Sequence, residues 1–79
     1  MMEIKVLGSG CSRCRELLAN VREALAESGK TADVEYVTDM KRIMGYGVMG
    51  LPALVVDGAV VSVGTVLKAA EVEALLAGK

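Results

Sequence analysis

The chain of 79 residues contains no histidine, phenylalanine or tryptophan, a single proline and only two cysteines. Without histidine, nucleophilic catalysis by a Cys-His or Ser-His pair is excluded within one chain. A tetrahedral structural zinc site would need ligands from two chains or borrowed carboxylates. The apolar residues, 53% of the chain, are nearly all aliphatic, which is typical of a globular protein with an aliphatic core.

The chain also lacks a long hydrophobic run and an excess of charge of one sign. The longest apolar stretch, Val48 to Val56, is interrupted by Gly50 and Pro52 and is far shorter than the ~20 residues that span a bilayer. Nine basic and ten acidic residues are interspersed and leave a formal net charge of −1. We therefore predict neither a membrane nor a nucleic-acid partner.

The first residues, "MMEIKVLG", have neither the basic segment nor the apolar segment that an export signal requires. We therefore expect a cytoplasmic location. Thiols are kept reduced in that compartment, so a close pair of cysteines there is more often catalytic, redox-sensing or metal-binding than a structural bridge.

The pattern of apolar residues predicts one domain over residues 1–79. Apolar residues from Leu17 to Leu25 recur on one face of a helix, and Asp57-Gly58 between valine-rich runs predicts a two-residue hairpin. The expected elements are a strand at 3–7, a helix at 12–28 stopped by Gly29, a strand at 31–37, a short helix capped by Thr38 or Asp39, two strands after Pro52, and a helix at 66–77 capped by Thr65 and stopped by Gly78.

This order, β-α-β-α-β-β-α, predicts an α/β fold. Strands joined through a helix pair in parallel, and the hairpin adds an antiparallel strand. The sequence therefore predicts a four-stranded mixed sheet flanked by three helices.

The two cysteines, Cys11 and Cys14, are separated by two residues and could form a disulfide staple, half of a metal site or a pair of reacting thiols. Residues at this spacing within a helix have Cβ atoms roughly 5–6 Å apart, whereas a disulfide needs about 3.8 Å. The pair can therefore close only if Cys11 caps the helix and Cys14 lies in its first turn. Because the closed loop is so short, the bridge would contribute only about 2 kcal/mol as a staple.

A helix start favours negative charge, so a thiolate at Cys11 is expected there with a lowered pKa. Arg13 and Arg15 place two cations nearby. We therefore predict that Cys11 is the nucleophile that forms a mixed disulfide and that Cys14 resolves it.

Three segments together resemble the thioredoxin superfamily, and most closely its small prokaryotic thioredoxin-like or glutaredoxin-like redox-active disulfide proteins. They are "IKVLGSGCSRC", "GVMGLPALVVDGAVVSVG" and "TVLKAAEVEALL", and the resemblance extends over essentially the whole chain. The resemblance implies a thioredoxin-like fold and an enzyme of thiol-disulfide exchange that needs no cofactor. Its partners would be a disulfide-bearing protein or small thiol and a reductase, and we expect the chain to act as a monomer.

The resemblance also assigns residues. Leu51 and Pro52 would form the cis-proline segment that lies beside Cys11 and binds the substrate backbone, with Ser12 and Arg13 completing the substrate contacts. The pair Ser12-Arg13 replaces the Gly-Pro of typical thioredoxins and the Pro-Tyr of many glutaredoxins. The first strand, "IKVL", carries no buried acid of the kind that thioredoxin uses to assist proton transfer.

Two other functions remain open at this stage. A CxxC motif after a first strand is also similar to small copper chaperones, since two thiolates suit Cu(I). Against this, Ser9 stands where those proteins usually place methionine, and their element order is βαββαβ. The other alternative is a non-catalytic binding module that docks partners through residues 47–52.

Two groups of side chains are expected to be structural. The methionines at 40, 44 and 49 are expected to pack rather than to bind metal. Tyr36 and Tyr46 should cover edges of the core, and we also expect a role for Tyr46 near the cysteines.

Overall fold

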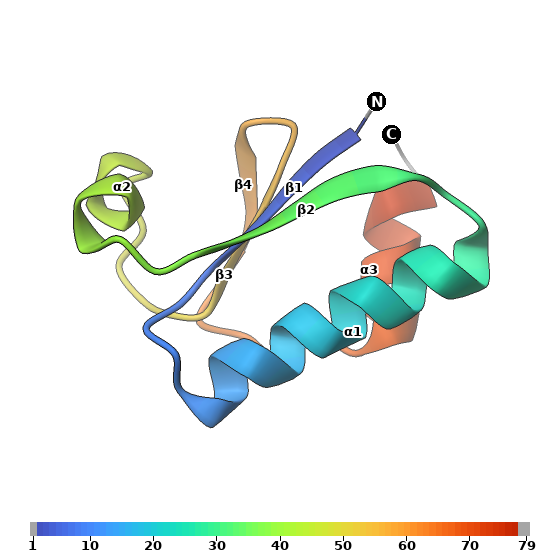
Figure 1. Ribbon diagram of the computed structural model, residues 1–79, viewed down its shortest axis with the longest axis horizontal. Coiled ribbons are helices and arrows are strands. Elements are labelled where there is room, and N and C mark those ends of the chain that lie inside the picture. The colour runs from blue at the N-terminus through green and yellow to red at the C-terminus, as the bar shows by residue number, and fades with distance from the viewer. Residues whose placement is uncertain (1, 78–79) are drawn as a thin grey trace.

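The computed structural model describes residues 2–77 and contains the predicted order of strands and helices (Figure 1). The predicted helix stop at Gly78 lies outside these residues. The elements are β1 (Met2–Leu7), α1 (Ser12–Ser28), β2 (Ala32–Val37), α2 (Met40–Gly45), β3 (Ala53–Val56), β4 (Ala59–Val63) and α3 (Ala69–Ala77).

The four strands form one mixed sheet in the order β2-β1-β3-β4. β1 and β2 are parallel, because α1 carries the chain back between them, and β3 is antiparallel to both β1 and β4. The predicted turn joins β3 to β4, with Asp57 at φ 50° and Gly58 at φ 83°, the left-handed conformation that a two-residue hairpin of this kind requires. The predicted α/β fold is thus confirmed.

Helices cover both faces of the sheet (Figure 1). α1 and α3 lie against each other on one face, and α2 covers part of the other. The larger core cluster lies under α1 and α3 and consists of Ile4, Val6, Leu17, Val21, Ala24, Leu54, Val56, Val72 and Leu76. The second cluster lies under α2 and consists of Leu7, Val37, Ile43, Ala53 and Val55.

The last helix begins later than the sequence predicts. Our expected range of 66–77 with Thr65 as the cap is wrong at its start, because α3 begins at Ala69. The Lys68 N–H donates to the Glu71 carboxylate at 2.9 Å, and the Leu67 carbonyl accepts from the Asn20 side chain on α1 at 2.8 Å. These contacts hold the segment before Ala69 outside the helix.

The short helix α2 begins at one of the two caps that the sequence offered. Asp39 is extended, with φ −71° and ψ 114°, and its carboxylate accepts the Lys41 N–H at 3.1 Å.

Among residues 2–77, no helix is long and apolar enough to cross a bilayer.

Candidate active site

The cysteine pair lies where β1 ends and α1 begins (Figure 1). Gly8 leaves the sheet by donating its N–H to the Val37 carbonyl at 3.0 Å. The chain then turns through Gly10, which has φ 88°, a conformation favoured by glycine. This short loop places Cys11 at the start of α1.

Cys11 is the N-cap of α1, with φ −72° and ψ 165°. Its Sγ accepts the backbone N–H of Cys14 at 3.4 Å, and the two sulfur atoms lie 2.7 Å apart. Cys11 is exposed, whereas Cys14 is buried at the first turn. A partner molecule can therefore reach only the Cys11 sulfur, and the Cys14 sulfur can reach Cys11.

The pKa of the Cys11 thiol is lowered, first by the hydrogen bond from the Cys14 side chain and then by the Cys14 backbone N–H. Smaller contributions come from the Arg13 backbone N–H and the Ser9 side chain, against an opposing effect of desolvation. The sequence suggested the cationic arginine side chains as a cause. In the structure the Arg13 guanidinium is bound elsewhere, to the Gly64 carbonyl at 3.0 Å.

The lowered pKa of the Cys11 thiol predicts how the rate of its alkylation depends on pH. Because the thiolate is the nucleophile, the rate of Cys11 alkylation by iodoacetamide should fall on acidification, with a midpoint below that of free cysteine. In Cys14→Ala the main hydrogen-bond donor is lost, so the midpoint should move to higher pH. Cys14→Ser, which keeps a donor, should move it less. Rates measured across pH with mass-spectrometric assignment check this, and a midpoint that is the same in all three proteins would contradict it.

The Leu51–Pro52 segment is held close to the start of α1. Its peptide bond is cis, Pro52 is buried and Leu51 is half-buried. The Pro52 carbonyl accepts the Gly64 N–H at 2.8 Å, and the Gly64 carbonyl accepts the Arg13 guanidinium. The structure thereby connects Arg13 to Pro52 through Gly64, while Ser12 is exposed at the first position of α1.

Tyr36 and Gly8 also lie at the cysteine site, where we did not expect them from the sequence. Tyr36, the last residue of β2 that faces the larger core, accepts the Gly10 N–H on its hydroxyl at 3.0 Å. A Cβ at Gly8 would lie 2.8 Å from the Cys14 sulfur and 3.1 Å from Tyr36 Cε1, so both side chains flank this glycine. Tyr46, for which we expect a role near the cysteines, packs against the second core cluster. The sequence carried no signal for either contact, because both depend on the register in which β1 pairs with β2, with Val6 beside Tyr36.

Metal binding has few candidate ligands at this site. Within residues 2–77 no group of three or more Cys, Asp or Glu side chains is placed to hold an ion. Cys11 and Cys14 are the side chains that could bind a thiophilic metal. The element order, moreover, differs from the βαββαβ order of copper chaperones.

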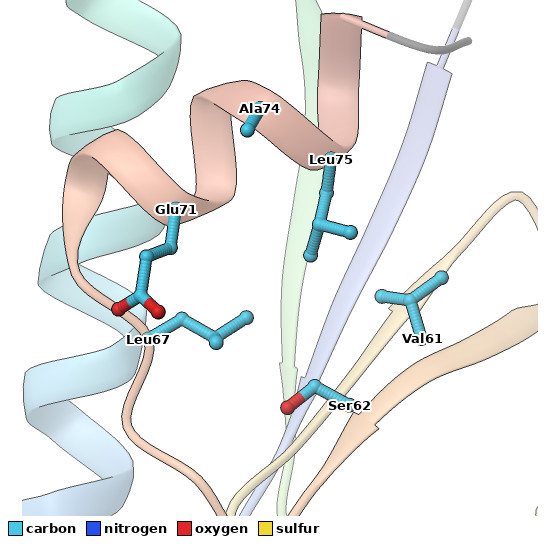
Figure 2. A pocket seen from close by; sticks show the side chains of 6 residues that line it. All are labelled: Val61, Ser62, Leu67, Glu71, Ala74 and Leu75. Atoms are coloured by element: carbon cyan, nitrogen blue, oxygen red, sulfur yellow. The ribbon is translucent and has the colours of Figure 1, made fainter.

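A hollow of about 400 Å³ lies away from the cysteines, between β4 and α3 (Figure 2). Its lining consists of Val61, Ser62, Leu67, Glu71, Ala74 and Leu75. The carboxylate in this set is the one that accepts the Lys68 N–H. Neither cysteine lines the hollow, so it is separate from the cysteine pair.

The fold and its CxxC pair define a thioredoxin-like protein of the thiol-disulfide oxidoreductase class. A family model described as a thioredoxin domain matches residues 2–77. The chain therefore belongs to the thioredoxin domain family.

Individual relatives agree with this membership. A thioredoxin of Methanothermobacter thermautotrophicus is 38% identical over 76 residues, which cover 96% of this chain and 99% of that protein. A thioredoxin of Methanocaldococcus jannaschii is 30% identical over 73 residues, covering 92% of this chain and 84% of its own. Another thioredoxin of that organism is 34% identical over 68 residues, covering 82% of this chain and 80% of its own.

Proposed function

We propose that this protein exchanges disulfides with a protein or small-thiol partner, with Cys11 as the attacking thiol and Cys14 as the resolving thiol. The observation that carries the proposal is the asymmetry of the pair. Cys11 is exposed at a helix N-cap with a lowered pKa, and its sulfur lies 2.7 Å from that of the buried Cys14.

The reaction has two steps. The Cys11 thiolate attacks one sulfur of the substrate disulfide, which forms a mixed disulfide and expels the other substrate sulfur as a thiolate. The Cys14 thiol then gives its proton to water, and its thiolate attacks the Cys11 sulfur. This forms the Cys11–Cys14 disulfide and releases the second substrate thiolate. Two electrons have passed to the substrate, and a reductase partner must return the pair to dithiol.

The substrate chain would lie along Leu51 and Pro52, beside Cys11. This proposal is supported by the connection from Arg13 through Gly64 to Pro52, which fixes that segment relative to the helix start. Arg13 uses one guanidinium nitrogen on Gly64, and the guanidinium has further donors for a substrate carbonyl or carboxylate. Ser12, exposed at the same turn, completes the contact surface. We place this activity in the cytoplasm and assign it to the monomer.

A redox titration tests the function. The protein is equilibrated in mixtures of reduced and oxidised dithiothreitol, and free thiols are counted after acid quenching. Both thiols should disappear together in one two-electron transition, and the protein should accelerate the reduction of a protein disulfide by dithiothreitol. Thiols that do not pair would contradict the proposal. Stoichiometric copper in anaerobically purified protein would favour the metal-binding alternative.

A further inference from the structure

Tyr36 brings a hydroxyl group from β2 to the loop that carries the cysteines. The hydroxyl oxygen accepts the Gly10 N–H at 3.0 Å, one residue before Cys11. The ring edge flanks Gly8 together with the Cys14 sulfur, because a Cβ at Gly8 would lie within 3.1 Å of both. The phenol of Tyr36 therefore lies next to Cys14, the buried cysteine, which a partner molecule does not reach.

We propose that the Tyr36 hydroxyl donates its hydrogen to the Cys14 sulfur whenever that sulfur is a thiolate, and so promotes the resolving step. This inference rests on the proposed function. Tyr36 is then the group that stabilises the charged form of the buried sulfur, at the start of α1 where the two cysteines meet.

A buried thiolate needs such a donor, because a charge removed from water is costly unless a hydrogen bond compensates it. Cys14 is fully buried, and within residues 2–77 the other buried side chains are apolar, with no buried charged or polar side chain among them. The Gly10 N–H occupies a lone pair of the Tyr36 oxygen, which leaves the hydroxyl hydrogen for another acceptor. The phenol can therefore accept a hydrogen bond from Gly10 and donate one to another acceptor at the same time.

The protonation state of the phenol agrees with this role. Burial raises the pKa of Tyr36, and the charges on the Cys14 and Cys11 sulfurs raise it further, against the lowering effect of the Gly10 N–H. The hydroxyl therefore keeps its proton at neutral pH and acts as a donor, not as a base. The other titratable group at the Cys14 sulfur is the Cys11 thiol, while the Arg13 guanidinium is bound to Gly64.

The hydrogen bond would act in both directions of exchange. When Cys14 resolves a mixed disulfide, its thiolate forms a bond to the Cys11 sulfur and the substrate thiolate leaves. When a reductant thiolate attacks Cys11, the Cys11–Cys14 bond breaks and the electron pair goes to the Cys14 sulfur. In each case the Tyr36 proton stays on its oxygen, and the donor stabilises the same buried thiolate.

The rates of attack by Cys11 and of resolution by Cys14 can be measured separately with dithiobis(nitrobenzoate), an aromatic disulfide that releases a coloured thiolate. Attack by Cys11 releases the first thiolate, and resolution by Cys14 releases the second. In Tyr36→Phe we expect the second phase to slow about ten-fold, the size of effect given by one hydrogen bond to a charged group. The first phase should change by less than about two-fold on the same scale. Tyr46→Phe is the matched control and should leave both phases unchanged.

The result of this experiment distinguishes failure of the proposed function from failure of the role proposed for Tyr36. If the wild-type protein shows no second phase, the proposed function itself is wrong. If the wild-type protein shows both phases and Tyr36→Phe changes neither, or slows both equally, Tyr36 has no donor role in resolution and only the present inference falls.

A second variant does not depend on the stability of Tyr36→Phe. The chain has two tyrosines, so fluorotyrosine incorporated into Tyr46→Phe replaces Tyr36 alone. Its more acidic phenol still accepts from Gly10, yet it loses the donor hydrogen at lower pH. The rate of the second phase should therefore decline at lower pH than in unfluorinated Tyr46→Phe. An unchanged pH profile would overturn the proposal.

Discussion

Replacing Cys11 with serine is expected to reduce disulfide exchange to the uncatalysed rate, whereas Cys14→Ser should keep the first step and stop at the mixed disulfide. The reason is that Cys11 is exposed and the pKa of its thiol is lowered, while Cys14 is buried behind it. A serine at position 11 supplies no thiolate to attack the substrate. Intact-mass spectrometry after reaction with a disulfide substrate should show one covalent adduct on Cys14→Ser and none on Cys11→Ser.

The pair of variants also tests the order of the two cysteines. If Cys11→Ser formed the stable adduct and Cys14→Ser did not, Cys14 would be the attacking thiol and the geometric assignment would be reversed. An adduct on both variants would mean that burial does not protect Cys14. The wild-type protein, which can resolve the intermediate, should accumulate no adduct at the end of the reaction.

Gly8→Ala is expected to destabilise the reduced protein by ~1–3 kcal/mol, the usual cost of overpacking a filled site. A Cβ at this position would lie 2.5 Å from Cys14 Cβ, an atom that cannot rotate away because it is attached to the helix backbone. The new methyl group would also press on the Cys14 sulfur and the Tyr36 ring. Urea unfolding under reducing conditions measures the loss, and the rate of the resolving step should fall with it.

Gly45→Ala is the matched control. Position 45 is the last residue of α2, and an added Cβ there meets no atom within 4 Å. Replacing a helical glycine with alanine at such a place should stabilise the protein by about 0.5–1 kcal/mol or leave it unchanged. Equal free energies of unfolding for Gly8→Ala and Gly45→Ala would show that the close approach of Gly8 to Cys14 carries no energetic weight.

Features encoded within a few neighbouring residues could be predicted from the sequence. The range of α1 matches the prediction from Ser12 to Ser28, because a one-faced apolar stripe ends at Gly29, which takes a left-handed conformation. The Asp57-Gly58 hairpin follows from the turn that these two residues prefer. The geometry of the cysteine pair follows from its spacing and from the glycine in the loop before it.

Individual side-chain contacts between residues far apart in the sequence could not be predicted. Thr65 is a good local cap, yet α3 starts at Ala69 because α1 holds the preceding loop through Asn20. From the sequence we expect the Arg13 cation to lower the pKa of Cys11. In the structure its guanidinium binds the carbonyl of Gly64, 51 positions away.

The sequence by itself determined the order of the elements, the mixed sheet and the position of two reacting sulfurs at a helix start, because each follows from local periodicity, turn preference or spacing. Only the tertiary structure decided what surrounds those sulfurs. Gly10 and Tyr36 are 26 positions apart in the chain, and they meet because β1 and β2 pair in a particular parallel register. That register is set by how both faces of the sheet bury their side chains, and no short segment encodes it.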